Sequence, residues 1–155
     1  MPEFKPTDVS ETPYLYCERE CSMDPADISE KMGSAFQQVW GFMEANAIRP
    51  NGPALSVYYD YTPDKMRFRA GFAVAHKDMA KADGTVLADV TPAGRVLHFV
   101  HRGSYSTLRD DYGLLMQYAT DHGLEIAAPG WEFYLNDPNM VPEKDLVTEA
   151  YVSLA

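Results

Sequence analysis

The segment WEFYLN, residues 131–136, decides how this chain is expected to fold. A short run rich in aromatic residues is typical of a β-strand. Side chains alternate across a strand, so Trp131 and Phe133 are expected on one face and Glu132 and Tyr134 on the other. We expect the bulky apolar face to pack under helices and the polar face to line a pocket. The alternative is a polar face that simply contacts solvent.

A similar pattern stands 76 residues earlier in the chain. Sequence identity between the two regions is weak, but residue character and turn signals agree. Residues of matching character are Ser56 with Glu132, Tyr58 with Tyr134, Asp60 with Asn136 and Phe36 with Tyr112. An internal repeat of this length indicates two copies of one supersecondary unit, which we expect to be related by a pseudo-two-fold axis.

Each copy is predicted to run strand, helix, strand, strand. In the first copy, Asp24 and Pro25 form a helix start signal, and apolar residues then recur at helical spacing. The predicted class is α+β, with an antiparallel sheet and a central ligand cleft between the halves. The expected organisation is a loose N-terminal arm (1–12) and one domain (13–155), whose halves span about 13–76 and 85–155, joined by a linker (77–84).

Composition narrows the range of functions. The 155 residues suit one domain, and 46% of them are hydrophobic. The net charge of −10 repels phosphate backbones, so direct nucleic-acid binding is not expected, whereas cations are attracted. The chain has no run of about 20 apolar residues and no signal-peptide pattern at its start. We therefore expect a cytoplasmic protein that does not contact membranes.

Neither the cysteines nor the histidines form a metal-binding pattern. Cys17 and Cys21 lie four apart in an expected strand, about 13 Å from each other, so two free thiols are predicted. His98 and His101 lie three apart in another strand and therefore on opposite faces. No metal and no cofactor is expected.

Glu132 is the most informative residue of the predicted pocket. A carboxylate among aromatic rings must take a cationic partner, accept hydrogen bonds or have its pKa raised. With tyrosines beside it, the site suits an aromatic or quaternary cation through charge pairing and cation–π contact.

Two motifs resemble those of a known family. The segments HRGSY (101–105) and WEFYLNDP (131–138), separated by an expected helix, are similar to the G-x-Y and E-x-Y-x-N/D-x-P elements of the gyrase-inhibitory-protein-like (GyrI-like) superfamily. The resemblance covers nearly the whole chain from Tyr14. It implies a duplicated strand-helix-strand-strand fold that binds small molecules, as in the effector domains of multidrug-response transcription regulators.

The resemblance also implies roles for individual residues. Glu132 becomes the pocket carboxylate and Tyr134 its neighbour in the pocket, and Tyr105 lies at the start of the second helix. Tyr58 is added by repeat symmetry. Trp40 is a further ligand-binding candidate, although helical periodicity places it in the core. No helix-turn-helix precedes the domain in this sequence, so DNA binding is not carried over.

Three functions remain open at this point. The first is a stand-alone module that binds amphipathic aromatic, cationic compounds for sequestration or sensing. The second is a hydrolase of electrophilic cyclopropanoid compounds, with Glu132 and Tyr134 as its catalytic residues. The third is an interaction protein that inhibits DNA gyrase. An exposed sheet edge could also pair two chains into a homodimer.

Overall fold

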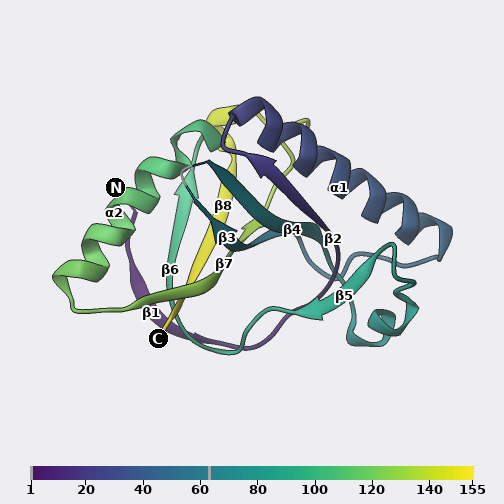
Figure 1. Cartoon of the computed structure of the whole chain (residues 1–155), viewed down its shortest axis with the longest axis horizontal. Coiled ribbons are helices and arrows are strands. Elements are labelled where there is room, and N and C mark those ends of the chain that lie inside the picture. The colour runs from purple at the N-terminus through teal and green to yellow at the C-terminus, as the bar shows by residue number, and fades with distance from the viewer. Residues whose placement is uncertain (1, 63) are drawn as a thin grey trace.

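A unit of strand, helix, strand and strand occurs twice in the computed structural model, which describes residues 2–62 and 64–155 (Figure 1). The first copy comprises β2 (Pro13–Ser22), α1 (Pro25–Ala45), β3 (Ala54–Tyr61) and β4 (Lys65–Ala73). The second copy comprises β6 (Gly94–Arg102), α2 (Leu108–Asp121), β7 (Ile126–Tyr134) and β8 (Val147–Leu154). The predicted α+β repeat is confirmed.

All strands belong to one antiparallel sheet with the order β1-β6-β8-β7-β3-β4-β2-β5. This order is symmetric about its centre, because β7, β8 and β6 on one side correspond to β3, β4 and β2 on the other. At the centre, Ser56 of β3 lies directly opposite Glu132 of β7. The pseudo-two-fold axis therefore passes close to this pair of residues.

The outermost strands are exchanged between the halves. β1 (Lys5–Val9) leads into β2 but pairs with β6, and β5 (Leu87–Val90) leads into β6 but pairs with β2. The expectation of a loose arm is therefore wrong for residues 5–9. The ladder with β6 orders them, and the Phe4 ring packs against Phe99 at 5.5 Å and Tyr118 at 5.4 Å. The predicted linker contains the short 3-10 helix η1 (His76–Lys81).

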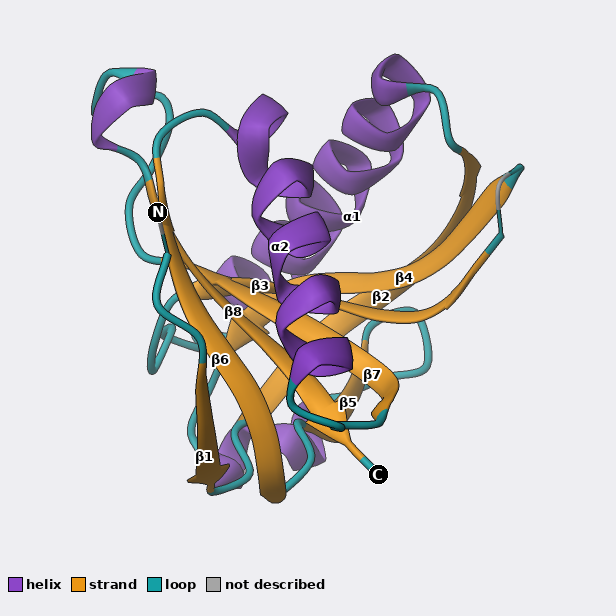
Figure 2. Cartoon of the chain, turned by 90° about the vertical axis from the view of Figure 1, so that its left-hand side faces the viewer, coloured by secondary structure: helices purple, strands orange, loops and turns teal. Residues whose placement is uncertain are grey.

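Both α-helices lie over the same face of the sheet and diverge from each other (Figure 2). Asp24 caps α1 by accepting a hydrogen bond from the Ala26 backbone N–H at 3.0 Å. Each helix buries one apolar stripe, which holds it on its own half of the sheet. The buried residues are Ala35, Val39 and Met43 in α1 and Leu108, Leu115 and Ala119 in α2.

The helix-free face of the sheet carries its own apolar core. Trp131, 1% exposed, packs there with Val57, with Tyr14 of β2 and with Val96 of β6. β2 and β6 lie near opposite ends of the strand order, so the sheet curls until its ends cover this face. The expectation that Trp131 and Phe133 pack under the helices is wrong, because the curled sheet buries them without a helix.

The structure also shows the state of the two cysteines and the apolar length of the helices. Cys17 and Cys21 are buried free thiols, as predicted. Within residues 2–62 and 64–155, no helix is both long enough and apolar enough to cross a bilayer.

Candidate functional site

The strands next to the pseudo-two-fold axis carry polar side chains toward the helices. Glu132 of β7 lies opposite Ser56 of β3 and Ala150 of β8, and Tyr134 lies opposite Thr148. Directly opposed residues on neighbouring strands project from the same face. Ser56 faces α1, because its Oγ lies 3.6 Å from the Met32 sulfur. A row of polar groups therefore crosses the centre of the sheet under the helices.

The carboxylate of Glu132 accepts hydrogen bonds from three tyrosines. Tyr112 of α2 donates to Oε2 at 2.5 Å, while Tyr134 and Tyr58 donate to Oε1 at 2.7 Å and 3.1 Å. The Tyr134 hydroxyl also lies 3.0 Å from Ser56 Oγ. These donors come from α2, β7 and β3, so both halves of the molecule hold one carboxylate.

Burial controls the protonation of this cluster. Glu132 is only 3% exposed. Burial raises the pKa of Glu132, although the hydrogen bonds from Tyr112, Tyr134 and Tyr58 oppose the rise. Burial, followed by the negative charge of Glu132, also raises the pKa of Tyr58 and Tyr134 well above the usual value. The phenols therefore remain protonated donors at neutral pH.

The ion pairs found among the described residues do not include Glu132. The carboxylate is thus stabilised by neutral donors and not by a lysine or arginine. In the same part of the chain, no three His, Cys, Asp or Glu side chains are grouped as a metal ion requires. The arrangement leaves a buried negative charge that a cation could neutralise.

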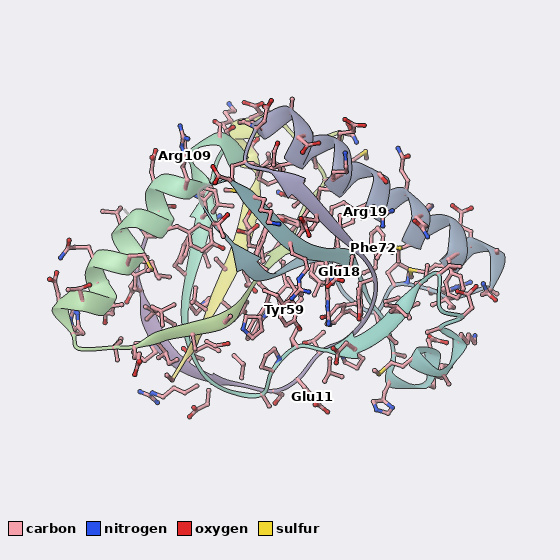
Figure 3. All side chains as sticks on the ribbon, viewed as in Figure 1. Glu11, Glu18, Arg19, Tyr59, Phe72 and Arg109 are labelled. Carbon is pink, nitrogen blue, oxygen red and sulfur yellow. The ribbon has the colours of Figure 1, made fainter. Side chains whose placement is uncertain are left out.

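The other predicted site residues lie farther from the carboxylate. Tyr105, in the 3-10 turn η2 (Tyr105–Thr107), is 38% exposed, and its ring meets the Tyr134 ring edge to face at 5.6 Å. Trp40 is 44% exposed, so the expectation of a core position is wrong. Its ring contacts Phe72, and both Phe72 and Arg19 lie beside α1 (Figure 3).

An aromatic chain connects Trp40 to the carboxylate cluster. The Phe36 ring lies 5.8 Å from Phe72 and 6.2 Å from Tyr134. Trp40 follows Phe36 by one helical turn on α1. The structure therefore brings together Glu132, Tyr134 and Tyr58, places Tyr105 at their edge and leaves Trp40 on the outer side of Phe36.

Sequence reasoning did not single out Tyr112 as a site residue. Its helical spacing from Leu108 and Leu115 predicts only core packing, whereas its hydroxyl reaches Glu132. The repeat links Tyr112 to the site, because Tyr112 corresponds to Phe36, and Phe36 contacts Tyr134. Asn136, which follows Tyr134 by two residues, forms hydrogen bonds with the backbone of Asp145 and Val147. The side chain of its counterpart, Asp60, lies outside the described residues.

A hollow of about 640 Å³ lies beside α2, away from Glu132. Its lining includes Glu3, Arg102, His101 and Asp111. His101 is buried, with Nδ1 at 2.5 Å from the Asp111 carboxylate and Nε2 at 3.0 Å from the Ser104 carbonyl. Both ring nitrogens thus face oxygen atoms of the protein. Strand pairing places His101 on the opposite side of β8 from Tyr134.

Residues 2–155 match the family model described as the GyrI-like small molecule binding domain. The chain belongs to this GyrI-like family. The match confirms the predicted resemblance over nearly the whole sequence. No curated protein matches the chain in sequence.

Solved structures share the GyrI-like fold at low sequence identity. The EcmrR C-terminal domain is 21% identical, with a TM-score of 0.80 and coverage of 100% of this chain and 98% of that one. In the EcmrR–DNA complex, the match is 19% identical, has a TM-score of 0.80 and covers 99% of this chain but 57% of that one.

SAV2435 bound to tetraphenylphosphonium is 12% identical, with a TM-score of 0.66 and coverage of 99% and 94%. A hydrolase from Listeria innocua is 14% identical, with a TM-score of 0.64 and coverage of 99% and 91%. At these identities, the likenesses show the fold alone.

Proposed function

We propose that this GyrI-like domain binds amphipathic aromatic cations and uses Glu132 as their counter-charge. The observation that carries the proposal is a carboxylate, 3% exposed, that accepts three tyrosine hydrogen bonds and pairs with no cation among the described residues. A bound cation would neutralise this buried charge, and the net charge of −10 favours its approach. Capture of such compounds would serve sequestration or sensing.

The aromatic side chains around Glu132 suit the apolar part of such a ligand. Phe36 and Tyr105 both contact the Tyr134 ring, and the faces of such rings attract cations. Because Glu132 is covered, a ligand must displace part of this aromatic layer to reach it. Tyr105 is the most exposed member, and we infer that it moves. Trp40 would then contact the outer part of a large ligand.

A hydrolase is the second candidate, and the raised pKa of Glu132 is the observation that favours it. A carboxylate with a raised pKa could act as a base toward water, with Tyr134 as a proton donor 2.7 Å away. The three phenols that occupy its oxygens favour the binding role. Incubation with an electrophilic cyclopropane separates the two, because an enzyme yields a ring-opened product and a binding module releases its ligand unchanged.

The proposal is tested by titrating tetraphenylphosphonium, the cation bound by SAV2435, into the wild type and two variants. Glu132→Gln preserves shape and removes the charge, and we expect affinity to fall by about 10- to 100-fold. The control is Glu149→Gln, which changes net charge equally, on the residue that accepts a hydrogen bond from Tyr151. The control should bind within about twofold of wild type. Equal losses in both variants would contradict the proposal.

A further inference from the structure

Thr148 of β8 has a buried hydroxyl that lacks a hydrogen-bond partner among the described residues. The residue is 0% exposed, and its Oγ1 forms no hydrogen bond within the described part of the chain. Two other buried side-chain atoms share this property, Arg69 Nε and His98 Nε2. Arg69 lies opposite Val57, and His98 stacks on Tyr151, so both belong to the helix-free face. Of the three atoms, Thr148 Oγ1 alone lies on the face of Glu132.

Two hydrogen-bond networks flank Thr148, and neither includes its hydroxyl. Thr148 lies opposite Tyr134 on one side and His101 on the other. The Tyr134 hydroxyl is engaged by Glu132 and Ser56. The His101 ring is engaged by Asp111 and by residues of the turn before α2. Both neighbours therefore already have hydrogen-bond partners, whereas the hydroxyl between them has none among the described residues.

The segment that would have to move for a ligand also contacts the two residues that flank Thr148. His101 Nε2 lies 3.0 Å from the Ser104 carbonyl and 3.2 Å from Thr107 Oγ1, and the Tyr105 ring packs on Tyr134. Residues 104–107 thus contact the side chains on both sides of Thr148. Displacement of Tyr105 would open a path to Glu132 and to Thr148 together.

We propose that Thr148 determines specificity by hydrogen-bonding a hydroxyl or amine carried by the bound cation. The inference rests on the proposed function and adds a second recognition point to it. Glu132 and Thr148 are diagonal neighbours on adjacent strands, so their backbones lie about 7–8 Å apart. The preferred ligand is therefore an aromatic cation with a hydrogen-bonding group about that far from its charge.

A matched pair of probes tests this inference. Tetraphenylphosphonium has no hydrogen-bonding group, whereas [4-(hydroxymethyl)phenyl]triphenylphosphonium carries one alcohol. One net hydrogen bond should make wild type prefer the alcohol by about 3- to 10-fold. Thr148→Val should abolish this preference, and Thr148→Ser, which keeps the hydroxyl, should retain it. Equal preference in wild type and Thr148→Val would overturn the inference.

Thermal unfolding without ligand provides an independent readout. Thr148→Val removes an unpartnered buried hydroxyl, so its Tm should equal or exceed that of wild type. The control is Thr91→Val, because the Thr91 hydroxyl is buried and accepts the Thr12 backbone N–H at 2.8 Å. The control should lower Tm and retain the preference for the alcohol. A similar loss of Tm in Thr148→Val would show that its hydroxyl is already partnered and would overturn the inference.

Glu132→Gln distinguishes a failure of the proposed role of Thr148 from a failure of the proposed cation binding. Weakened binding of both probes in this variant, with no preference for the alcohol in wild type, contradicts the role of Thr148 alone. Failure of both probes to bind wild type contradicts the proposed function and the inference with it.

Discussion

Glu132 combines two opposing effects in one side chain. Three phenol donors favour its charged form, but burial at 3% exposure raises its pKa despite them. An ordinary structural carboxylate would be paired with an arginine or lysine or would lie in solvent. Burial of this charge without a cationic partner among the described residues therefore destabilises the free protein and strengthens the attraction for a cation.

This reasoning predicts how stability depends on pH. The folded protein holds the proton on Glu132 more tightly than the unfolded chain, because the folded-state pKa is raised. The stability from this group is full below the unfolded-chain pKa and is lost as pH rises through the folded-state pKa. Glu132→Gln removes this loss, so the Tm of the variant relative to wild type should increase with pH.

Thermal denaturation between about pH 4 and pH 8 measures this effect. Glu149→Gln is the control, because it removes one negative charge from a half-buried position. A constant difference in Tm between Glu132→Gln and wild type across this range would be inconsistent with a carboxyl whose pKa is raised by burial.

Strand alternation and the repeat predicted part of the site. Glu132 and Tyr134 share a face because they are two residues apart on β7, and Tyr58 joins them through the repeat. Tyr112 could not be assigned in this way, because helical periodicity identifies a buried stripe but not which strand residue a phenol reaches. Trp40 was expected in the core for the same reason, yet it is 44% exposed.

At the scale of elements, the strands and helices were predictable from local patterns, but their partners were not. Periodicity and turn signals identified both copies of the repeat. The choice of face for Trp131 depends on the curl of the sheet, which brings Tyr14 of β2 and Val96 of β6 into one cluster with it. The exchange of β1 and β5 between the halves is also non-local, and no single segment encodes it.

The role of β1 leads to a stability prediction. The Phe4 ring contacts Phe99 and Tyr118, so Phe4→Ala should lower the free energy of unfolding by about 1–3 kcal/mol. Lys5→Ala, at an exposed position of the same segment, should cost less than about 0.5 kcal/mol. Chemical denaturation measures both values. Equal, negligible costs would show that the N-terminal segment is loose after all.

At the scale of the whole molecule, the carboxylate cluster lies where the two halves meet. Tyr58 and Ser56 come from the first half, and Glu132, Tyr134 and Tyr112 come from the second. The exchanged outer strands tie the halves together, so the spacing of the two helices above the cluster depends on the complete sheet. The scaffold is therefore symmetric, but the two equivalent positions beside the axis differ, because Glu132 carries a charge and Ser56 does not.

The most direct test of a charge-pairing site is the pH dependence of binding for a cation and a neutral analogue. As pH rises through the pKa of Glu132 in the free protein, tetraphenylphosphonium affinity should rise by about 10- to 100-fold in total, because the ionised carboxylate binds the cation more tightly than the protonated form does. Neutral triphenylphosphine oxide should lack this increase, and Glu132→Gln should lose it for the cation. Parallel pH profiles for the two compounds, or an unchanged cation profile in Glu132→Gln, would contradict the account.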